Sequence, residues 1–135
     1  MKRKFSSYLV QDLSTIKFQM PYFLQKFGIF CLLDNNQYDF NKSYEYVVGA
    51  GAIRSVIANE NNKLTAIDSF IQEADDWIFG HVAYDIKNEI ESLHSLHPDG
   101  IQFPDFLFFV PEIVFIIDGN KLQIGVINNF NADEI

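Results

Sequence analysis

The sequence predicts an α+β fold with a largely antiparallel β-sheet and about three short helices. Six or seven apolar or alternating segments have the length of strands, and three others have helical periodicity. A strong hairpin signal, Asp118-Gly119-Asn120, joins the last two strands. An α+β class follows because strands outnumber helices and a hairpin closes the chain. Residues 1–135, of which 48% are hydrophobic, have the size of a single domain or of one piece of a larger protein.

The first third of the chain predicts a strand, a helix and a second strand. Mixed alternation over Lys4–Val10 indicates the first strand. Pro21 stands near the start of an apolar-periodic segment that Gly28 follows, which predicts a helix over 18–27. The continuous apolar run Ile29–Asp34 is too short for a helix and predicts a buried strand.

The middle of the chain predicts two strands, a helix and a further strand. Ser43–Val48 and Ala52–Ile57 are rich in β-branched and aromatic residues, and the glycines between them predict a bend or bulge. Leu64–Ala74 has apolar residues three and four positions apart, which predicts an amphipathic helix. Trp77–Tyr84 then predicts another strand.

The last third predicts a short helix, a loop and a hairpin. Asp85–Leu93 indicates the helix, with Asp85 as its N-cap. Ser95–Pro104 predicts a loop, and Asp105–Ile117 with Lys121–Ile127 the two strands of the hairpin. Because the segment Phe103–Ile117 is apolar on both sides, we expect an exposed apolar patch and self-association of the isolated chain.

Charge and cysteine content restrict the classes of function. Eighteen acidic residues against ten Lys and Arg give a net charge of −8, which argues against nucleic acid as a partner. The longest uncharged run, Leu122–Ala132, is shorter than the roughly 18 apolar residues of a membrane helix, so no membrane partner is expected. The lone cysteine, Cys31, excludes an internal disulfide, fits a reducing cytoplasm and is expected to be a buried, inert thiol.

The residues show no complete catalytic or metal site. Glu91-x-x-His94-x-x-His97 has spacing that a metal site can use, but Ser and Pro nearby favour a solvated helix end. Cys31 has no His close to it in the sequence, and His81 in an apolar strand is typical of a core or interface histidine. We therefore predict no catalytic residue and no metal ligand.

Four segments carry a resemblance to a known family. They are Phe27–Asn36, Tyr44–Gly51, Asp76–Glu89 and Phe103–Glu112. Together they resemble the N-terminal region of chorismate-utilising enzymes related to anthranilate synthase component I. Within that family they are most similar to para-aminobenzoate (aminodeoxychorismate) synthase component I. The resemblance implies that this chain has the N-terminal part of that fold.

The resemblance implies a function for a longer protein. The full-length enzymes convert chorismate and glutamine-derived ammonia to 4-amino-4-deoxychorismate for folate synthesis, with Mg²⁺ as cofactor. Their catalytic residues lie in a C-terminal chorismate-binding region that is absent from residues 1–135. The chain is thus expected to be a single N-terminal domain or fragment, inactive alone and without a cofactor of its own. Its expected partners are that C-terminal region and a glutamine amidotransferase subunit.

The resemblance also implies an amino-acid pocket. In the family a Leu-Leu-x-Ser stretch and the next strand help to hold tryptophan. Here Leu32-Leu33-Asp34-Asn35 matches that stretch, with Asn35 in place of the serine. The implied lining residues are Leu33, Asp34, Asn35, Tyr44 and Tyr46, with Asp34 facing the ligand's amino group. A strand end capped by a polar turn explains the same residues without a ligand.

Two other functions fit the same residues. One is a stand-alone amino-acid-sensing or interaction domain of this fold. The other is the N-terminal part of an anthranilate or isochorismate synthase, which the N-terminal region distinguishes poorly from para-aminobenzoate synthase.

Overall fold

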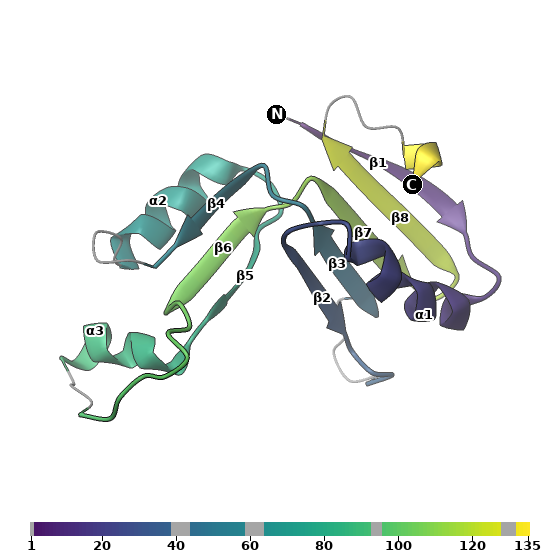
Figure 1. Cartoon of the computed structure of the whole chain (residues 1–135). Helices are drawn as coiled ribbons and strands as arrows, with labels where there is room; N and C mark the ends of the chain where they lie inside the picture. The colour runs from purple at the N-terminus through teal and green to yellow at the C-terminus, as the bar shows by residue number, and fades with distance from the viewer. Residues whose placement is uncertain (1, 39–43, 59–63, 93–95, 128–131) are drawn as a thin grey trace. The chain divides into compact units, whose positions relative to one another are not determined.

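The computed structural model describes residues 2–38, 44–58, 64–92, 96–127 and 132–135. Its contacts divide the chain into two compact units, Met1–Ile53 with Pro111–Ile135 and Arg54–Val110. Each unit contains one sheet, and every strand pair in both sheets is antiparallel (Figure 1). The predicted α+β class with antiparallel sheets is therefore confirmed.

The sheet of the first unit has five strands in the order β1-β8-β7-β3-β2. They are β1 (Arg3–Leu9), β2 (Phe30–Asp34), β3 (Tyr46–Ala50), β7 (Ile113–Asp118) and β8 (Lys121–Ile127). The β7–β8 hairpin is confirmed, with Asp118 paired to Lys121 and a two-residue turn between them. Gly119 in this turn has a φ of 59°, a conformation that glycine adopts without steric cost.

One face of this sheet packs against helix α1 (Leu13–Leu24). Val48, Phe115 and Ile124 lie on that face and are buried together with Leu24 and Met20 of the helix. Opposite residues in antiparallel strands point to the same side of a sheet, so alternate positions of β3, β7 and β8 build this core. The apolar residues of α1 and the alternate apolar residues of the strands thus form one hydrophobic cluster.

Helix α1 begins and ends earlier than the predicted range of 18–27. Its N-cap is Asp12, whose carboxylate accepts hydrogen bonds from the Thr15 amide at 3.1 Å and from the Thr15 hydroxyl at 2.5 Å. Pro21 therefore lies inside the helix, where its ring nitrogen has no hydrogen to donate to the Lys17 carbonyl. Proline was the wrong marker for the helix start, and the capping aspartate was the informative one.

The predicted strand Asp105–Ile117 is two strands in two different sheets. β6 (Phe106–Val110) belongs to the second unit and β7 to the first. Pro111 separates them, and a proline cannot donate a hydrogen bond to a sheet ladder. Of the apolar side chains in Phe103–Ile117, only Phe103 is strongly exposed. The stretch therefore does not form the expected exposed patch, and self-association stays a prediction.

The sheet of the second unit has the order β4-β6-β5, with β4 (Arg54–Ile57) and β5 (Phe79–Val82) at its edges. Helix α2 (Leu64–Ala74) has the predicted bounds and contacts β4. The Arg54 guanidinium makes an ion pair with Glu73 at 2.7 Å and lies 5.6 Å from the centroid of Phe70. The amphipathic face predicted for α2 is thus attached to this sheet.

The remaining helical segments are short. A 3-10 turn, η1 (Tyr84–Ile86), leads into α3 (Lys87–Glu91), and η2 (Ala132–Glu134) lies near the last residue. Asp85 lies inside η1 and does not cap it, so the prediction of an Asp85 N-cap was wrong. None of the helices in the described ranges is both long enough and apolar enough to cross a membrane.

Candidate functional site

The residues of the predicted amino-acid pocket lie where β2 ends and β3 begins. Asp34 is the register partner of Tyr46, so these two side chains are on the same face of the sheet as α1. Leu33 is one position away, points to the opposite face and is 58% exposed. The structure therefore brings Asp34 and Tyr46 together and does not bring Leu33 to them.

A lysine that the sequence analysis missed joins these residues. The Lys17 ammonium is 3.1 Å from Asp34 Oδ1 and 3.5 Å from Glu45 Oε1. It also lies 5.3 Å from the centroid of the Tyr46 ring. We call Lys17, Asp34, Glu45 and Tyr46 the Lys17 cluster. Lys17 comes from α1, Asp34 from β2 and Tyr46 from β3, and Glu45 directly precedes β3. The formal charge of the cluster is −1.

Asn35 makes its hydrogen bonds within the turn that follows β2. Its side-chain oxygen accepts from the Gln37 amide at 3.0 Å, and its side-chain nitrogen donates to the Tyr38 carbonyl at 3.3 Å. These bonds stabilise the left-handed backbone of Gln37, whose φ is 63°. Tyr44 is 45% exposed. This geometry fits a capped strand end, and a ligand role for Asn35 and Tyr44 stays a prediction.

The Lys17 cluster changes the proton affinities of two groups. Partial burial works to raise the pKa of Asp34, but hydrogen bonds from the Asn36 amide and from Lys17 outweigh it and hold the pKa below its usual value. Burial, together with the negative charge of Asp34, raises the pKa of Tyr46 to about 12. At neutral pH the cluster therefore holds an ionised carboxylate beside a fully protonated phenol.

The raised pKa of Tyr46 predicts a loss of stability in alkali. In the unfolded chain the phenol loses its proton near pH 10, at about the ordinary tyrosine value. In the folded chain it keeps the proton up to about pH 12. The unfolded state thus binds fewer protons between these values, so the free energy of unfolding falls as the pH rises from about 10 to 12. Ultraviolet titration of phenolate and urea unfolding at each pH measure both effects.

Tyr46→Phe is the matched variant for this prediction. It keeps the ring and removes the titrating hydroxyl. We expect its titration to lack the step near pH 12 and its stability to fall less between pH 10 and 12 than that of the wild-type chain. Equal loss of stability in both chains would show that Tyr46 does not control the alkaline transition.

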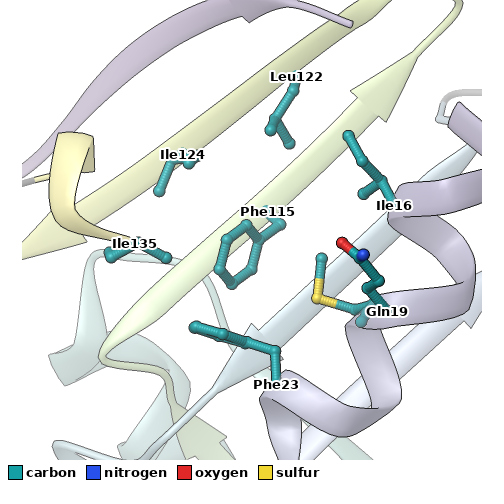
Figure 2. A pocket seen from close by; sticks show the side chains of 8 residues that line it. Ile16, Gln19, Phe23, Phe115, Leu122, Ile124 and Ile135 are labelled. Atoms are coloured by element: carbon teal, nitrogen blue, oxygen red, sulfur yellow. The ribbon is translucent and has the colours of Figure 1, made fainter. Parts of the chain in front are cut away.

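The structure contains an apolar pocket that sequence reasoning did not find. It has a volume of about 200 Å³ and lies in the first unit between α1 and the β7–β8 hairpin (Figure 2). It shares no residue with the predicted amino-acid pocket. Its lining residues are Ile16, Gln19, Met20, Phe23, Phe115, Leu122, Ile124 and Ile135. No motif marks this pocket, because it depends on how the helix packs on the sheet.

The described residues contain no group of three or more His, Cys, Asp or Glu side chains that could hold a metal ion. His94 of the Glu91–His97 spacing lies outside those residues. A site for Mg²⁺ requires several oxygen ligands, so the described part of this chain does not fit that cofactor.

His81 packs against an aromatic ring, and Cys31 is partly buried. The His81 ring lies 4.6 Å from the Phe103 ring, and its Nε2 is 3.3 Å from the Pro104 carbonyl oxygen. The Cys31 thiol is half-buried, and burial raises its pKa, which disfavours the reactive thiolate. The contacts of His81 agree with the packing role expected for it. Cys31 is only half-buried, on the edge strand β2, so the prediction of a buried thiol was wrong.

Comparison with known proteins gives a local similarity. No family model matches the chain. Anthranilate synthase component 1 of Thermus thermophilus is 44% identical over 44 residues, which are 33% of this chain and 10% of that protein. Anthranilate synthase component 1 of Cereibacter sphaeroides is 32% identical over 50 residues, 37% of this chain and 10% of that protein. The similarity supports the chorismate-utilising family. It does not single out para-aminobenzoate synthase within that family.

Proposed function

We propose that residues 1–135 are the N-terminal, non-catalytic part of a para-aminobenzoate (aminodeoxychorismate) synthase component I. The full-length protein would convert chorismate and glutamine-derived ammonia to 4-amino-4-deoxychorismate in the cytoplasm. The observation that carries this proposal is the local similarity to anthranilate synthase component 1, at 44% identity over 44 residues. The choice of para-aminobenzoate synthase within the family rests on the four sequence segments that resemble it.

The surroundings of the motif residues support a scaffolding role. In the segment Asp76–Glu89, Gly80 packs directly beneath Phe108 of the neighbouring strand. In the segment Phe103–Glu112, Phe106 and Phe109 are almost completely buried. These residues are therefore used for packing between strands, which is what a non-catalytic region of an enzyme requires.

Catalysis is assigned to a chorismate-binding region beyond this chain. That region would supply the Mg²⁺ ligands. A glutamine amidotransferase subunit would deliver ammonia to it. The contribution of residues 1–135 is to fold and to support that region.

The test is a product analysis on the complete protein whose reading frame contains residues 1–135. With chorismate, ammonium and Mg²⁺, we expect 4-amino-4-deoxychorismate, recognised by its conversion to para-aminobenzoate when the lyase is added. Residues 1–135 alone are expected to leave chorismate unchanged. Formation of anthranilate or isochorismate by the complete protein would contradict the proposed reaction. Turnover by residues 1–135 alone would contradict the non-catalytic role.

A second candidate is the sensing of a tryptophan-like amino acid at the Lys17 cluster. The cluster favours it because two carboxylates, Asp34 and Glu45, share one ammonium and leave a net negative charge for a ligand's amino group. Inhibition of the complete protein by L-tryptophan that is lost in Asp34→Asn would support this role. An unchanged rate at all tryptophan concentrations would argue against it.

A further inference from the structure

The lining of the apolar pocket in the first unit changes from buried apolar side chains at the floor to an exposed polar side chain at the rim. Its floor is formed by Met20, Phe115 and Ile124, which are 6%, 4% and 5% exposed. Half-buried side chains of α1, β8 and the last residue form its walls. Gln19 is exposed and, among the described residues of the lining, is the only one with a polar side chain (Figure 2). The pocket is thus apolar in its depth and has one hydrogen-bonding group at its rim.

We propose that this pocket binds a small, uncharged aromatic molecule with one hydrogen-bonding substituent. A cavity of about 150 Å³ lined by Leu, Ile and Phe is large enough to bind benzene. The pocket here is about 200 Å³, which leaves room for one ring and a small substituent. The Gln19 amide has donors and an acceptor, so it suits a ligand hydroxyl. This inference concerns a different site from the Lys17 cluster and does not depend on the proposed enzyme activity.

The lining favours an aromatic ring over an aliphatic chain. The rings of Phe23 and Phe115 meet edge to face, with their centroids 5.6 Å apart. A third ring beside this pair gains the same quadrupole attraction. The Met20 thioether is flexible and polarisable, so it adapts to a ring that enters beside it.

The lining also disfavours a charged ligand. Among the residues that the structure describes, no ionisable side chain lines the pocket. A carboxylate or ammonium placed at its floor would lose its hydration without a partner, which is strongly unfavourable. The Lys26 ammonium lies 3.8 Å from the centroid of Phe23 and is not part of the lining. A charged ligand is therefore expected to bind more weakly than its neutral counterpart.

The Met20 methyl group is a direct probe of occupancy. The chain has two methionines, Met1 and Met20, so a spectrum of ¹³C-methyl-labelled protein contains two resonances to assign. We propose titrating the chain with para-cresol, whose hydroxyl matches the Gln19 amide. The expected result is a saturable shift of the Met20 resonance, because an aromatic ring bound at the floor changes the local magnetic field. The Met1 resonance should not move.

Variants of the lining residues, with one control outside the lining, locate the ligand. Gln19→Ala should weaken para-cresol binding by about threefold to tenfold, the effect of losing one hydrogen bond, and leave toluene binding unchanged. Leu122→Trp should fill the pocket from β8 and abolish the shift. Phe18→Ala is the matched control, because Phe18 is on the same helix, is 70% exposed and does not line the pocket. If Leu122→Trp fails to fold, Ile16→Phe fills the pocket from the helix side and gives the same test.

The possible results distinguish a neutral aromatic ligand in the pocket from a charged ligand and from a second copy of the chain. A saturable Met20 shift that disappears in the filled variant supports the proposal. No saturable shift up to the solubility of para-cresol would overturn it, as would an equal shift in the filled variant. Tighter binding of benzoate than of para-cresol would overturn the preference for a neutral ligand. A Met20 shift that depends on protein concentration alone would assign the pocket to a second copy of this chain and would also overturn the proposal.

Discussion

Replacing Gly80 with alanine is expected to lower the free energy of unfolding of the second unit by about 3 kcal/mol or more. A Cβ atom at Gly80 would overlap the Leu107 carbonyl oxygen of β6. It would also lie 2.5 Å from the Phe108 ring and 2.8 Å from the Phe108 Cα. The carbonyl and the Cα are backbone atoms, so they can move only if the β5–β6 pairing is disturbed. Strand β5 would have to separate from β6.

Trp77 provides the measurement for Gly80→Ala. It is the only tryptophan of the chain, and its ring stacks on Phe79 at a centroid distance of 6.1 Å. Phe79 belongs to β5, so tryptophan fluorescence during urea unfolding reports on the strand that Gly80→Ala disturbs. We expect the unfolding midpoint to move to clearly lower urea, or the folded signal to be absent at zero urea.

Gly100→Ala is the matched control in the same unit. A Cβ at Gly100 has no heavy atom within 4 Å, and its backbone φ is not in the left-handed region. The substitution should therefore leave stability unchanged or raise it slightly, because alanine reduces the freedom of the unfolded chain. If Gly80→Ala and Gly100→Ala unfold at the same urea concentration, the inference that β5 and β6 lie too close at Gly80 for a Cβ atom is wrong.

Much of the fold could be predicted because its signals are local. Helix α2 has the predicted bounds, since its apolar residues repeat with helical spacing and a left-handed Asp75 follows its last residue. Strand β8 also has its predicted bounds, since a two-residue turn fixes the start of the hairpin. In both elements the residues that set the limits lie within a few positions of the element itself.

The errors occurred where two local signals competed. At α1 the prediction used Pro21 as the marker of the helix start, whereas Asp12 caps the helix, because its carboxylate satisfies an otherwise unbonded amide. Between β6 and β7 the apolar run continues through Pro111, so hydrophobicity alone indicated one strand. The proline was the signal that the chain leaves one sheet there and enters another.

The candidate site could be predicted only in part. The sequence placed Asp34 and Tyr46 on neighbouring strands, and their common face follows from the register of β2 and β3. It could not provide Lys17, because that residue precedes the predicted helix and reaches Asp34 only when α1 packs on the sheet. The apolar pocket has the same origin: its floor combines α1 with β7 and β8, about 100 positions apart in the sequence.

Replacing Arg3 with methionine is expected to destabilise the first unit by about 1.5–3 kcal/mol, the range for a hydrogen bond to a charged group. The Arg3 guanidinium donates to three backbone carbonyls, those of Pro111 at 2.7 Å, Gly125 at 2.9 Å and Glu112 at 3.1 Å. The arginine thus connects strand β1 to the segment that leads into β7. Methionine keeps the length of the aliphatic stem but removes every donor, so part-buried carbonyls would lose their partner.

Lys4→Met is the control for this effect, because it removes an equal charge from the next position of β1. Lys4 is exposed and points to the other face of the sheet, so its loss should change the free energy of unfolding by less than about 0.5 kcal/mol. Chemical unfolding followed by circular dichroism, together with amide exchange of β1 and β8, measures both variants. Arg3→Met should speed amide exchange along β1 first, because β1 is an edge strand that pairs only with β8. Equal exchange rates in Arg3→Met and Lys4→Met would mean that Arg3 stabilises the first unit only through its charge and not through its hydrogen bonds.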